Sequence, residues 1–144
     1  DGDIFLAGHT LSGTQNWDTY TVKIDNNGNL IWDSIKGNPR GFNPEYIHDE
    51  AWGVKATDDG GCVLIAGTGD EYDQYSNTCE DSRESSDRWK VYLIRLDALG
   101  DVVWEKTYGL GAEDWAGEDV KITQDEGIVV GVDNGRFGFL KLSH

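Results

Sequence analysis

The feature that most constrains the fold is a segment of the chain that occurs more than once. Residues 19–32 (TYTVKIDNNGNLIW) align with residues 91–104 (VYLIRLDALGDVVW) at a constant offset of 72, since 91 − 19 = 72. Residues 54–61 (VKATDDGG) align with residues 120–127 (VKITQDEG) at an offset of 66, since 120 − 54 = 66. Because the two offsets differ, the repeated elements keep their sequence while the connections vary in length, as in repeat proteins.

The repeated segments have the pattern of β-strands joined by tight turns. Within residues 19–24 the even positions are larger and mostly apolar and the odd positions are polar, which is the period of two of a strand. Residues 25–28, 58–61 and 97–100 each combine an aspartate that can cap turn amides with a glycine for a left-handed conformation. No stretch has a 3.6-residue apolar period, so the sequence predicts no helix.

The predicted strands follow a cycle of four, here called A, B, C and D. We expect strand A at 52–57 and 120–123, strand B at 4–8, 63–67 and 128–131, strand C at 19–24, 91–96 and 137–142, and strand D at 30–35 and 102–108. The chain then runs BCD, ABCD, ABC. Antiparallel four-stranded meanders at this spacing predict an all-β fold of β-propeller blades, about two and a half of them, in an incomplete ring.

This order predicts one β-repeat region over residues 1–144. It comprises a partial blade at 1–36, a full blade at 50–108 with an insertion at 69–89, and a partial blade at 115–144. Because propellers close with about 4–8 blades, the expected partner is the rest of a longer propeller or a second copy of the chain. The chain starts inside the repeat and without Met, which we expect to reflect processing or truncation.

The motifs resemble repeats of large secreted or surface-anchored bacterial proteins that are predicted β-propellers. The likeness rests on Asp-Gly-Gly before an apolar run and on Leu-Asp-x-x-Gly-x-x-x-Trp, which ends at Trp104 and, with Ile for Leu, at Trp32. The second motif also resembles the docking motif of quinoprotein-type propellers, in which the tryptophan packs between neighbouring blades. The resemblance implies the fold and this packing role. No counterpart of the quinone-binding residues is visible, and such repeats serve adhesion, carbohydrate handling and scaffolding.

The charge of the chain limits its partners. The formal net charge of this acidic protein is −15, so nucleic acid and anionic membrane surfaces would be repelled. No apolar run approaches the ~20 residues of a membrane span, so we expect no membrane insertion. We expect an extracellular or cell-surface location and a carbohydrate or protein ligand.

The long connections lie at one end of the predicted sheets. In a meander the A–B and C–D turns share one end, where the connections are short, and the B–C and D–A loops share the other. Loops longer than the connection requires often carry function. Their aromatic and basic residues suit stacking against a sugar ring, and the candidate ligand-binding residues are Trp17, Arg40, Tyr46, His48, Tyr72, Tyr75 and Trp89.

The insertion at 69–89 is either a solvated loop or a cation site. Its acidic residues include Asp70 and Asp73, and several carboxylates on one flexible segment suit calcium, the one cofactor that the sequence suggests. Cys62 and Cys79 are either free thiols or a disulfide that closes a loop of about seventeen residues, which would contribute roughly 3 kcal/mol.

Two functions remain open at this point. The first is a non-catalytic binding or scaffold module of a secreted or cell-surface protein that recognises carbohydrate. The alternative is a propeller-type polysaccharide lyase or hydrolase that uses His48, Tyr46 and Arg40. No zinc spacing and no nucleophile-elbow motif occurs, so the sequence favours the module and assigns no catalytic residue.

Overall fold

The computed structural model describes residues 2–11, 16–40, 47–70, 88–111 and 113–143, and the described chain is all-β. Tyr46, Tyr72, Asp73, Tyr75 and Cys79 lie outside these residues. The strands are β1 (Ile4–Thr10), β2 (Asp18–Ile24), β3 (Leu30–Lys36), β4 (Ile47–Ala56), β5 (Cys62–Asp70), β6 (Lys90–Leu96), β7 (Val102–Tyr108), β8 (Ala116–Ile122), β9 (Ile128–Asp133) and β10 (Phe137–Leu142). The described residues contain no helix, and therefore none that could cross a bilayer.

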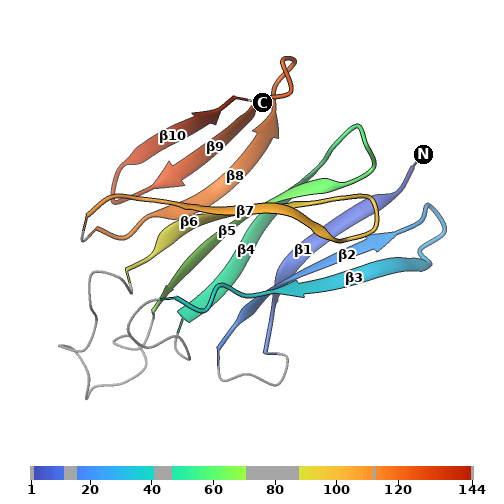
Figure 1. Ribbon diagram of the computed structural model, residues 1–144, viewed down its shortest axis with the longest axis horizontal. Helices are drawn as coiled ribbons and strands as arrows, with labels where there is room; N and C mark the ends of the chain where they lie inside the picture. Colours follow the sequence, from blue (N-terminus) through green and yellow to red (C-terminus); the bar gives the residue numbers. More distant parts are fainter. Residues whose placement is uncertain (1, 12–15, 41–46, 71–87, 112, 144) are drawn as a thin grey trace.

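The strands form three antiparallel sheets, in which each strand pairs with its neighbours in sequence. Sheet 1 has the order β1-β2-β3, sheet 2 the order β4-β5-β6-β7, and sheet 3 the order β10-β9-β8. In Figure 1 sheet 2 lies between sheet 1, drawn in blue, and sheet 3, drawn in orange and red. The all-β prediction is confirmed at this level.

Sheet 2 is covered on both faces, so it forms the centre of the molecule. One face carries Cys62, Leu64, Ala66, Tyr92, Ile94 and Leu96, against which Phe5, Ala7 and Trp32 of sheet 1 pack. The other face carries Val63, Ile65, Val91 and Leu93, which form a cluster with Val120, Val130 and Val132 of sheet 3. All nine residues of β5 are buried as a result.

The three sheets share their register. Ile4 pairs with Ile24, Cys62 with Leu96, and Ile128 with Leu142. Counting from these pairs assigns equivalent positions in all three sheets, such as Lys23, Arg95 and Lys141.

Irregularities of the pairing recur at equivalent positions. The register shifts between Lys23 and Ile24 and again between Arg95 and Leu96. It also shifts between Ala51 and Gly53 and between Gly117 and Asp119, which places one extra residue, Trp52 or Glu118, in the edge strand.

The short turns at one end of the sheets, the short-turn end, also match. In the turns 25–29, 57–61, 97–101 and 123–127, the first amide donates to the fifth carbonyl and the fourth amide to the first carbonyl. The fourth residue has a positive φ in each turn, at Gly28 (85°), Gly60 (84°), Gly100 (86°) and Glu126 (59°). The predicted capping is confirmed, because Oδ1 of Asp97 accepts the amides of Leu99 and Asp101 at 2.8 and 3.0 Å.

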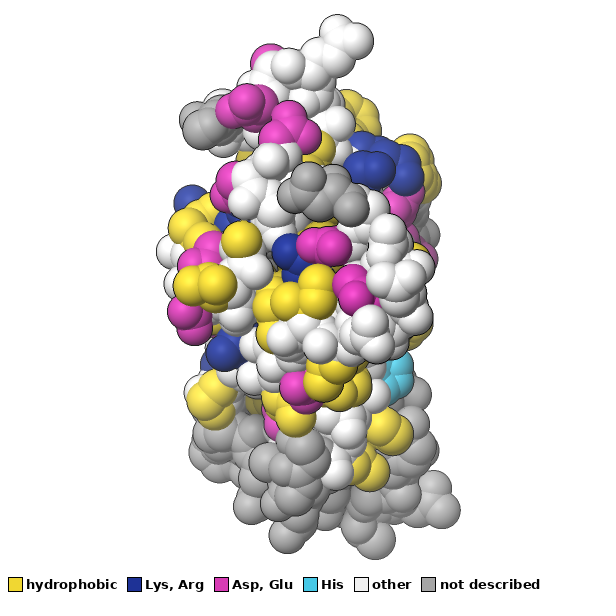
Figure 2. All heavy atoms as spheres, turned by 90° about the vertical axis from the view of Figure 1, so that its right-hand side faces the viewer, with side chains coloured by type: hydrophobic (Ala, Val, Ile, Leu, Met, Phe, Trp, Pro, Cys, Tyr) yellow, Lys and Arg dark blue, Asp and Glu magenta, His cyan; other side chains and the backbone are white. Residues whose placement is uncertain are grey.

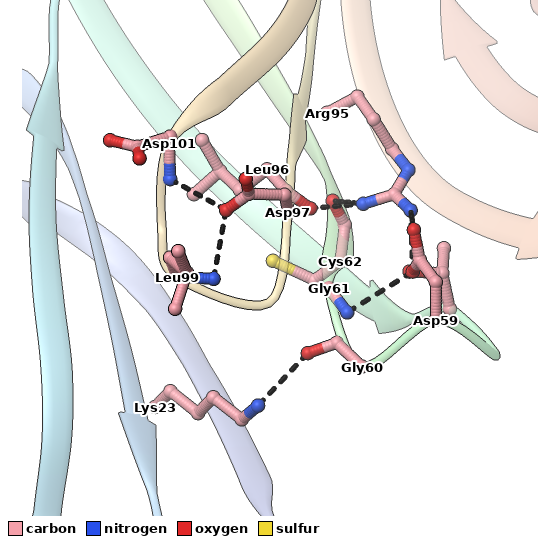
Figure 3. Close-up of polar contacts among 11 residues, drawn as sticks. Lys23, Asp59, Gly60, Gly61, Cys62, Arg95, Leu96, Asp97, Leu99 and Asp101 are labelled. Carbon is pink, nitrogen blue, oxygen red and sulfur yellow. Dashed lines mark hydrogen bonds and ion pairs between the residues drawn. The ribbon is translucent and has the colours of Figure 1, made fainter.

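Ion pairs at this end hold the turns. Figure 3 shows the Arg95 guanidinium between the Asp59 carboxylate, at 2.6 Å, and the carbonyl of Leu96. The hydroxyl of Thr57 and this guanidinium lower the pKa of Asp59 to about 2. Lys141 pairs in the same way with Asp125 at 2.9 Å. These charged groups are satisfied by one another, so their role is structural.

Sheet 1 is joined to sheet 2 by hydrogen bonds from Lys23 and Trp32, which have equivalents in sheet 2. The Lys23 amino group donates to the Gly60 carbonyl at 2.9 Å, and Nε1 of Trp32 donates to the Ala98 carbonyl at 2.9 Å. The Trp32 ring lies so close to Gly100 that a Cβ there would be 3.0 Å from it. Trp32 and Trp104 thus pack against the two core clusters, but both are half-buried and not buried as a core aromatic would be.

Three details of the sequence prediction are wrong. Strands β4 and β8 begin at Ile47 and Ala116, before the predicted 52 and 120, because the extra bulge residue breaks the period of two. Strand β5 continues to Asp70, which is therefore a buried strand residue and not part of the insertion loop. His48 likewise lies on a strand and not in a loop.

Candidate binding surface at the long-loop end

The end of the sheets opposite the short-turn end, here the long-loop end, brings together side chains that are far apart in sequence. The pairings Thr10 with Asp18 and Thr68 with Lys90 place the β1–β2 and β5–β6 connections at this end. Ile47 at the start of β4 and Tyr108 at the end of β7 lie here too.

A first aromatic group joins sheet 1 to sheet 2. His9 is exposed near the end of β1, and its ring lies 5.0 Å from the Trp17 ring at an angle of 84°. The same His9 ring lies 6.5 Å from the ring of Trp52, the bulge residue of edge strand β4. Trp52 is 51% exposed, so the group is open to solvent.

Trp89 extends this group across sheet 2. A Cβ on Gly69 would lie 2.5 Å from the Trp89 ring, and one on Gly67 would lie 2.8 Å from it. The glycines therefore leave the space in which the ring lies on β5. The Cβ on Gly67 would also be 3.5 Å from Nε1 of Trp52, so both tryptophans reach the same point of β5.

Trp115 continues the arrangement toward sheet 3. Its backbone amide donates to the Trp89 carbonyl at 2.9 Å, and its Nε1 donates to the Leu110 carbonyl at 3.3 Å. Lys90 lies beside it and donates to the carbonyls of Gly111 at 3.2 Å and Glu113 at 3.3 Å. We call His9, Trp17, Trp52, Trp89 and Trp115 the aromatic row.

The arginines of this end support the backbone. Arg40 is half-buried, and its Nη2 donates to the carbonyl of Thr68 and, at 2.8 Å, to the carbonyl of Arg88. Arg88 lies 3.6 Å from the Asp114 carboxylate, which also accepts the Trp89 amide at 2.9 Å. Arg40 thus fastens the end of β5 and the residue before β6 to the segment after β3.

Two aspartates at this end are removed from solvent. Asp49 is 1% exposed and Asp70 is 0% exposed. Oδ2 of Asp49 accepts the Asn38 amide at 2.7 Å, and burial raises the pKa of this carboxyl to about 6. A Cβ on Gly37 would lie 2.3 Å from Oδ1 of Asp18 and 3.4 Å from Oδ2 of Asp49, so the two carboxylates approach the same glycine.

The described residues provide no metal centre. Among them, no group of three or more His, Cys, Asp or Glu side chains is arranged to hold an ion. The predicted partner of Asp70, Asp73, lies outside the described residues, so the calcium site remains a prediction.

The catalytic alternative rests on His48, which is half-buried on β4 and pairs with Gly69. It alternates along β4 with buried Asp49, so the two side chains point to opposite faces of sheet 2. Tyr46 lies outside the described residues, and Arg40 donates to backbone carbonyls. This geometry gives the lyase or hydrolase hypothesis no specific support.

Cys62 lies at the short-turn end, in the cluster between sheets 1 and 2. It is fully buried, and burial raises the pKa of the thiol to about 12. Since Cys79 lies outside the described residues, the pairing of the two cysteines remains a prediction.

Sequence reasoning found Trp17 and Trp89, and the structure brings them into one row. It missed His9, Trp52 and Trp115 as site residues. The offset of 66 relates the bulges at Trp52 and Glu118, but that offset does not reveal that a bulge turns the tryptophan out of the ladder. The contacts of His9 and Trp115 depend on how the sheets lie beside one another, which no local pattern encodes.

The comparisons with known proteins leave the family open. No protein-family model matches the chain, and a search of curated proteins finds no similar one.

Proposed function

We propose that the chain is a non-catalytic binding module of a secreted or cell-surface protein, built from β-propeller blades, and that a carbohydrate stacks on its aromatic row. The observation that carries this proposal is the aromatic row itself. It runs from His9 and Trp17 at the long-loop end through Trp52, the bulge residue in the middle of β4, and Trp89 to Trp115.

The shared registers support the propeller part of the proposal. The three consecutive antiparallel meanders have equivalent turns, and equivalent bulges occur in sheets 1 and 2 and in sheets 2 and 3, as in successive blades. The last strand of sheet 2, β7, is followed by β8, the strand of sheet 3 that contacts β4 and β5. A connection from the outer strand of one blade to the inner strand of the next has this form.

The chemistry of the row supports a neutral sugar. Tryptophan offers a flat apolar ring with one polar nitrogen, which matches the apolar face and hydroxyl rim of a sugar ring. Exposed Trp52 needs no reorganisation to accept such a face. A net charge of −15 disfavours polyanionic polysaccharides and leaves neutral oligosaccharides as the expected ligands.

The test is binding of the 144-residue chain to an array of neutral oligosaccharides, followed by calorimetric titration of the best binder. We expect Trp52→Ala to weaken binding at least about tenfold, which is roughly 1.4 kcal/mol. Leu99→Ala is the control, because Leu99 is 77% exposed at the short-turn end. It should bind like the unmodified chain.

Two outcomes would contradict the proposal. Full affinity in the Trp52→Ala variant would remove the aromatic row as the binding surface. Release of new reducing or unsaturated ends from the bound oligosaccharide would make the chain an enzyme and return attention to His48.

A further inference from the structure

Sheets 1 and 3 each have one face that no described part of the chain covers. The uncovered face of sheet 1 exposes Ile4 (48%), Leu6 (52%), Leu30 (61%) and Ile35 (40%). Viewed from the side on which β1–β3 lie, hydrophobic side chains occur in several groups among charged ones (Figure 2). The uncovered face of sheet 3 exposes Phe137 (89%) and Phe139 (70%). Apolar surface gathered on a sheet face indicates an interaction site.

The uncovered face of sheet 1 is equivalent to a covered face of sheet 2. By register, Leu6 corresponds to Leu64, Val22 to Ile94, and Ile24 to Leu96. Leu64, Ile94 and Leu96 are all 0% exposed because sheet 1 covers them. The uncovered face of sheet 1 therefore has the pattern of one that accepts another sheet.

A polar pair repeats this correspondence. In sheet 2 the Tyr92 hydroxyl donates to Glu105 at 2.7 Å, and Tyr92 is 0% exposed under sheet 1. In sheet 1 the equivalent Tyr20 hydroxyl donates to Asp33 at 3.2 Å, on the uncovered face. The pair exists in both sheets, but only one copy is covered.

The uncovered face of sheet 3 is equivalent to the opposite face of sheet 2. Phe137 corresponds to Val91 and Phe139 to Leu93, and both residues of sheet 2 are 0% exposed under sheet 3. The uncovered face of sheet 1 thus matches the face of sheet 2 that packs against sheet 1. The uncovered face of sheet 3 matches the face of sheet 2 that packs against sheet 3.

We infer that these faces bind one another between two copies of the chain, with sheet 3 of one copy on sheet 1 of the next. Within one chain sheet 1 packs on sheet 2 and sheet 2 on sheet 3, and the proposed contact adds sheet 1 of the next copy after sheet 3. In this order the Lys23 amino group donates to the Gly60 carbonyl of the neighbouring sheet. Gly2 is equivalent to Gly60, has a φ of 89° against 84°, and would lie at the corresponding place in the contact between two copies.

The contact is heterologous, since each copy uses a different face. Such contacts close into a ring when the rotation allows and otherwise extend into a filament. Two copies contribute six sheets, of which four have three strands and two have four, so a ring of six would contain four incomplete blades. A number of six lies within the ~4–8 blades of closed propellers, so we expect a closed dimer.

The first experiment is light scattering of the 144-residue chain after size exclusion, over a wide range of concentrations. We expect twice the 16.0 kDa mass of one chain. A species that remains monomeric at the highest concentration would overturn the inference and assign both faces to other parts of a longer polypeptide.

The second experiment separates a heterologous contact from a symmetric one. Leu6→Asp spoils the face of sheet 1 and Phe139→Asp that of sheet 3, and each variant alone should be monomeric. An equimolar mixture should recover a dimer, because one intact face remains on each variant. Leu99→Asp changes a leucine at the short-turn end that is 77% exposed, more than Leu6 at 52%, and this variant should dimerise like the unmodified chain.

The outcomes of the mixing experiment are decisive. Monomers in the mixture, or dimers of either single variant, would overturn the head-to-tail contact. Thermal denaturation checks that each variant is folded, which is expected because both side chains are exposed. The experiment involves the sheet faces and not the aromatic row, so self-association and ligand binding can fail independently.

Discussion

The buried carboxyl of Asp49 should give the protein a pH-dependent stability that one substitution removes. Burial raises the pKa of Asp49 from 3.8 to about 6, although Oδ2 accepts the Asn38 amide. This rise in pKa means that folding favours the protonated carboxyl over the ionised one by roughly 3 kcal/mol. Because the folded state binds this proton more tightly than the unfolded state, the contribution is complete below pH 3.8 and is lost as the pH rises through 6.

Asp49→Asn removes the charge and keeps an oxygen that can accept the Asn38 amide. We expect the variant to be more stable than the unmodified chain at pH 7.5. This advantage should shrink by up to roughly 3 kcal/mol between pH 7.5 and pH 4 as Asp49 of the unmodified chain takes up its proton.

Urea denaturation of both proteins at half-unit steps of pH measures this difference directly. Asp59, whose pKa is lowered to about 2, destabilises the fold only below its ordinary value of 3.8, and it does so equally in both proteins. Asp58→Asn is the control, because Asp58 is an exposed turn residue. A difference in unfolding free energy that stays constant from pH 7.5 to pH 4 would refute the reasoning.

Four further outcomes follow from the packing. Gly28→Ala and Gly100→Ala each place a Cβ at a positive φ (85° and 86°), and this strain should lower the free energy of unfolding by about 1–2 kcal/mol in both variants. Gly100→Ala should be destabilised more than Gly28→Ala, because its Cβ would also lie 3.0 Å from the Trp32 ring. Equal shifts of the urea midpoint would contradict the packing of Trp32 on sheet 2. Trp32→Ala should cost about 2 kcal/mol, below the range for a buried tryptophan, because the ring is half-buried; an unchanged midpoint would exclude the docking role. Native Cys62 should not react with a thiol reagent at pH 8, since the thiol is buried and its pKa is raised to about 12, and rapid labelling would contradict this burial. Replacing residues 72–86 by a short glycine-serine turn should leave the melting temperature nearly unchanged, because Thr68 and Lys90 already pair at this point, whereas loss of cooperative unfolding would give the insertion a structural role.

The turns and most strands follow from the sequence because their determinants are local. Asp97 and Gly100 need only their own turn to cap its amides and to adopt a positive φ. The packing of Trp32 on sheet 2 was expected from its recurrence at Trp104 and from the resemblance, whereas the half-burial of the ring was not. That burial depends on how far the β6–β7 turn extends over the ring, which is a property of two sheets.

The candidate site was less predictable for the same reason. Val22 and Ile24 show the alternation of a buried strand face, yet they lie on the uncovered side of sheet 1 while Thr19 and Thr21 are buried. Period two identifies a strand and its two faces, but it does not say which face meets a neighbouring sheet. The aromatic row takes residues in or next to strands of all three sheets, so it could be found only from the arrangement of the sheets.

At the bulges of Trp52 and Glu118, the side chain can change without a large effect on the stability of the sheet. At each bulge one side chain stands outside the ladder of paired residues, so neither pairing nor the core restricts what it is. Two equivalent sites of one chain carry an aromatic ring and a carboxylate on the same backbone. The bulge is therefore a natural position for grafting: exchanging tryptophan and glutamate between positions 52 and 118 should move the exposed ring from sheet 2 to sheet 3 and leave both sheets intact.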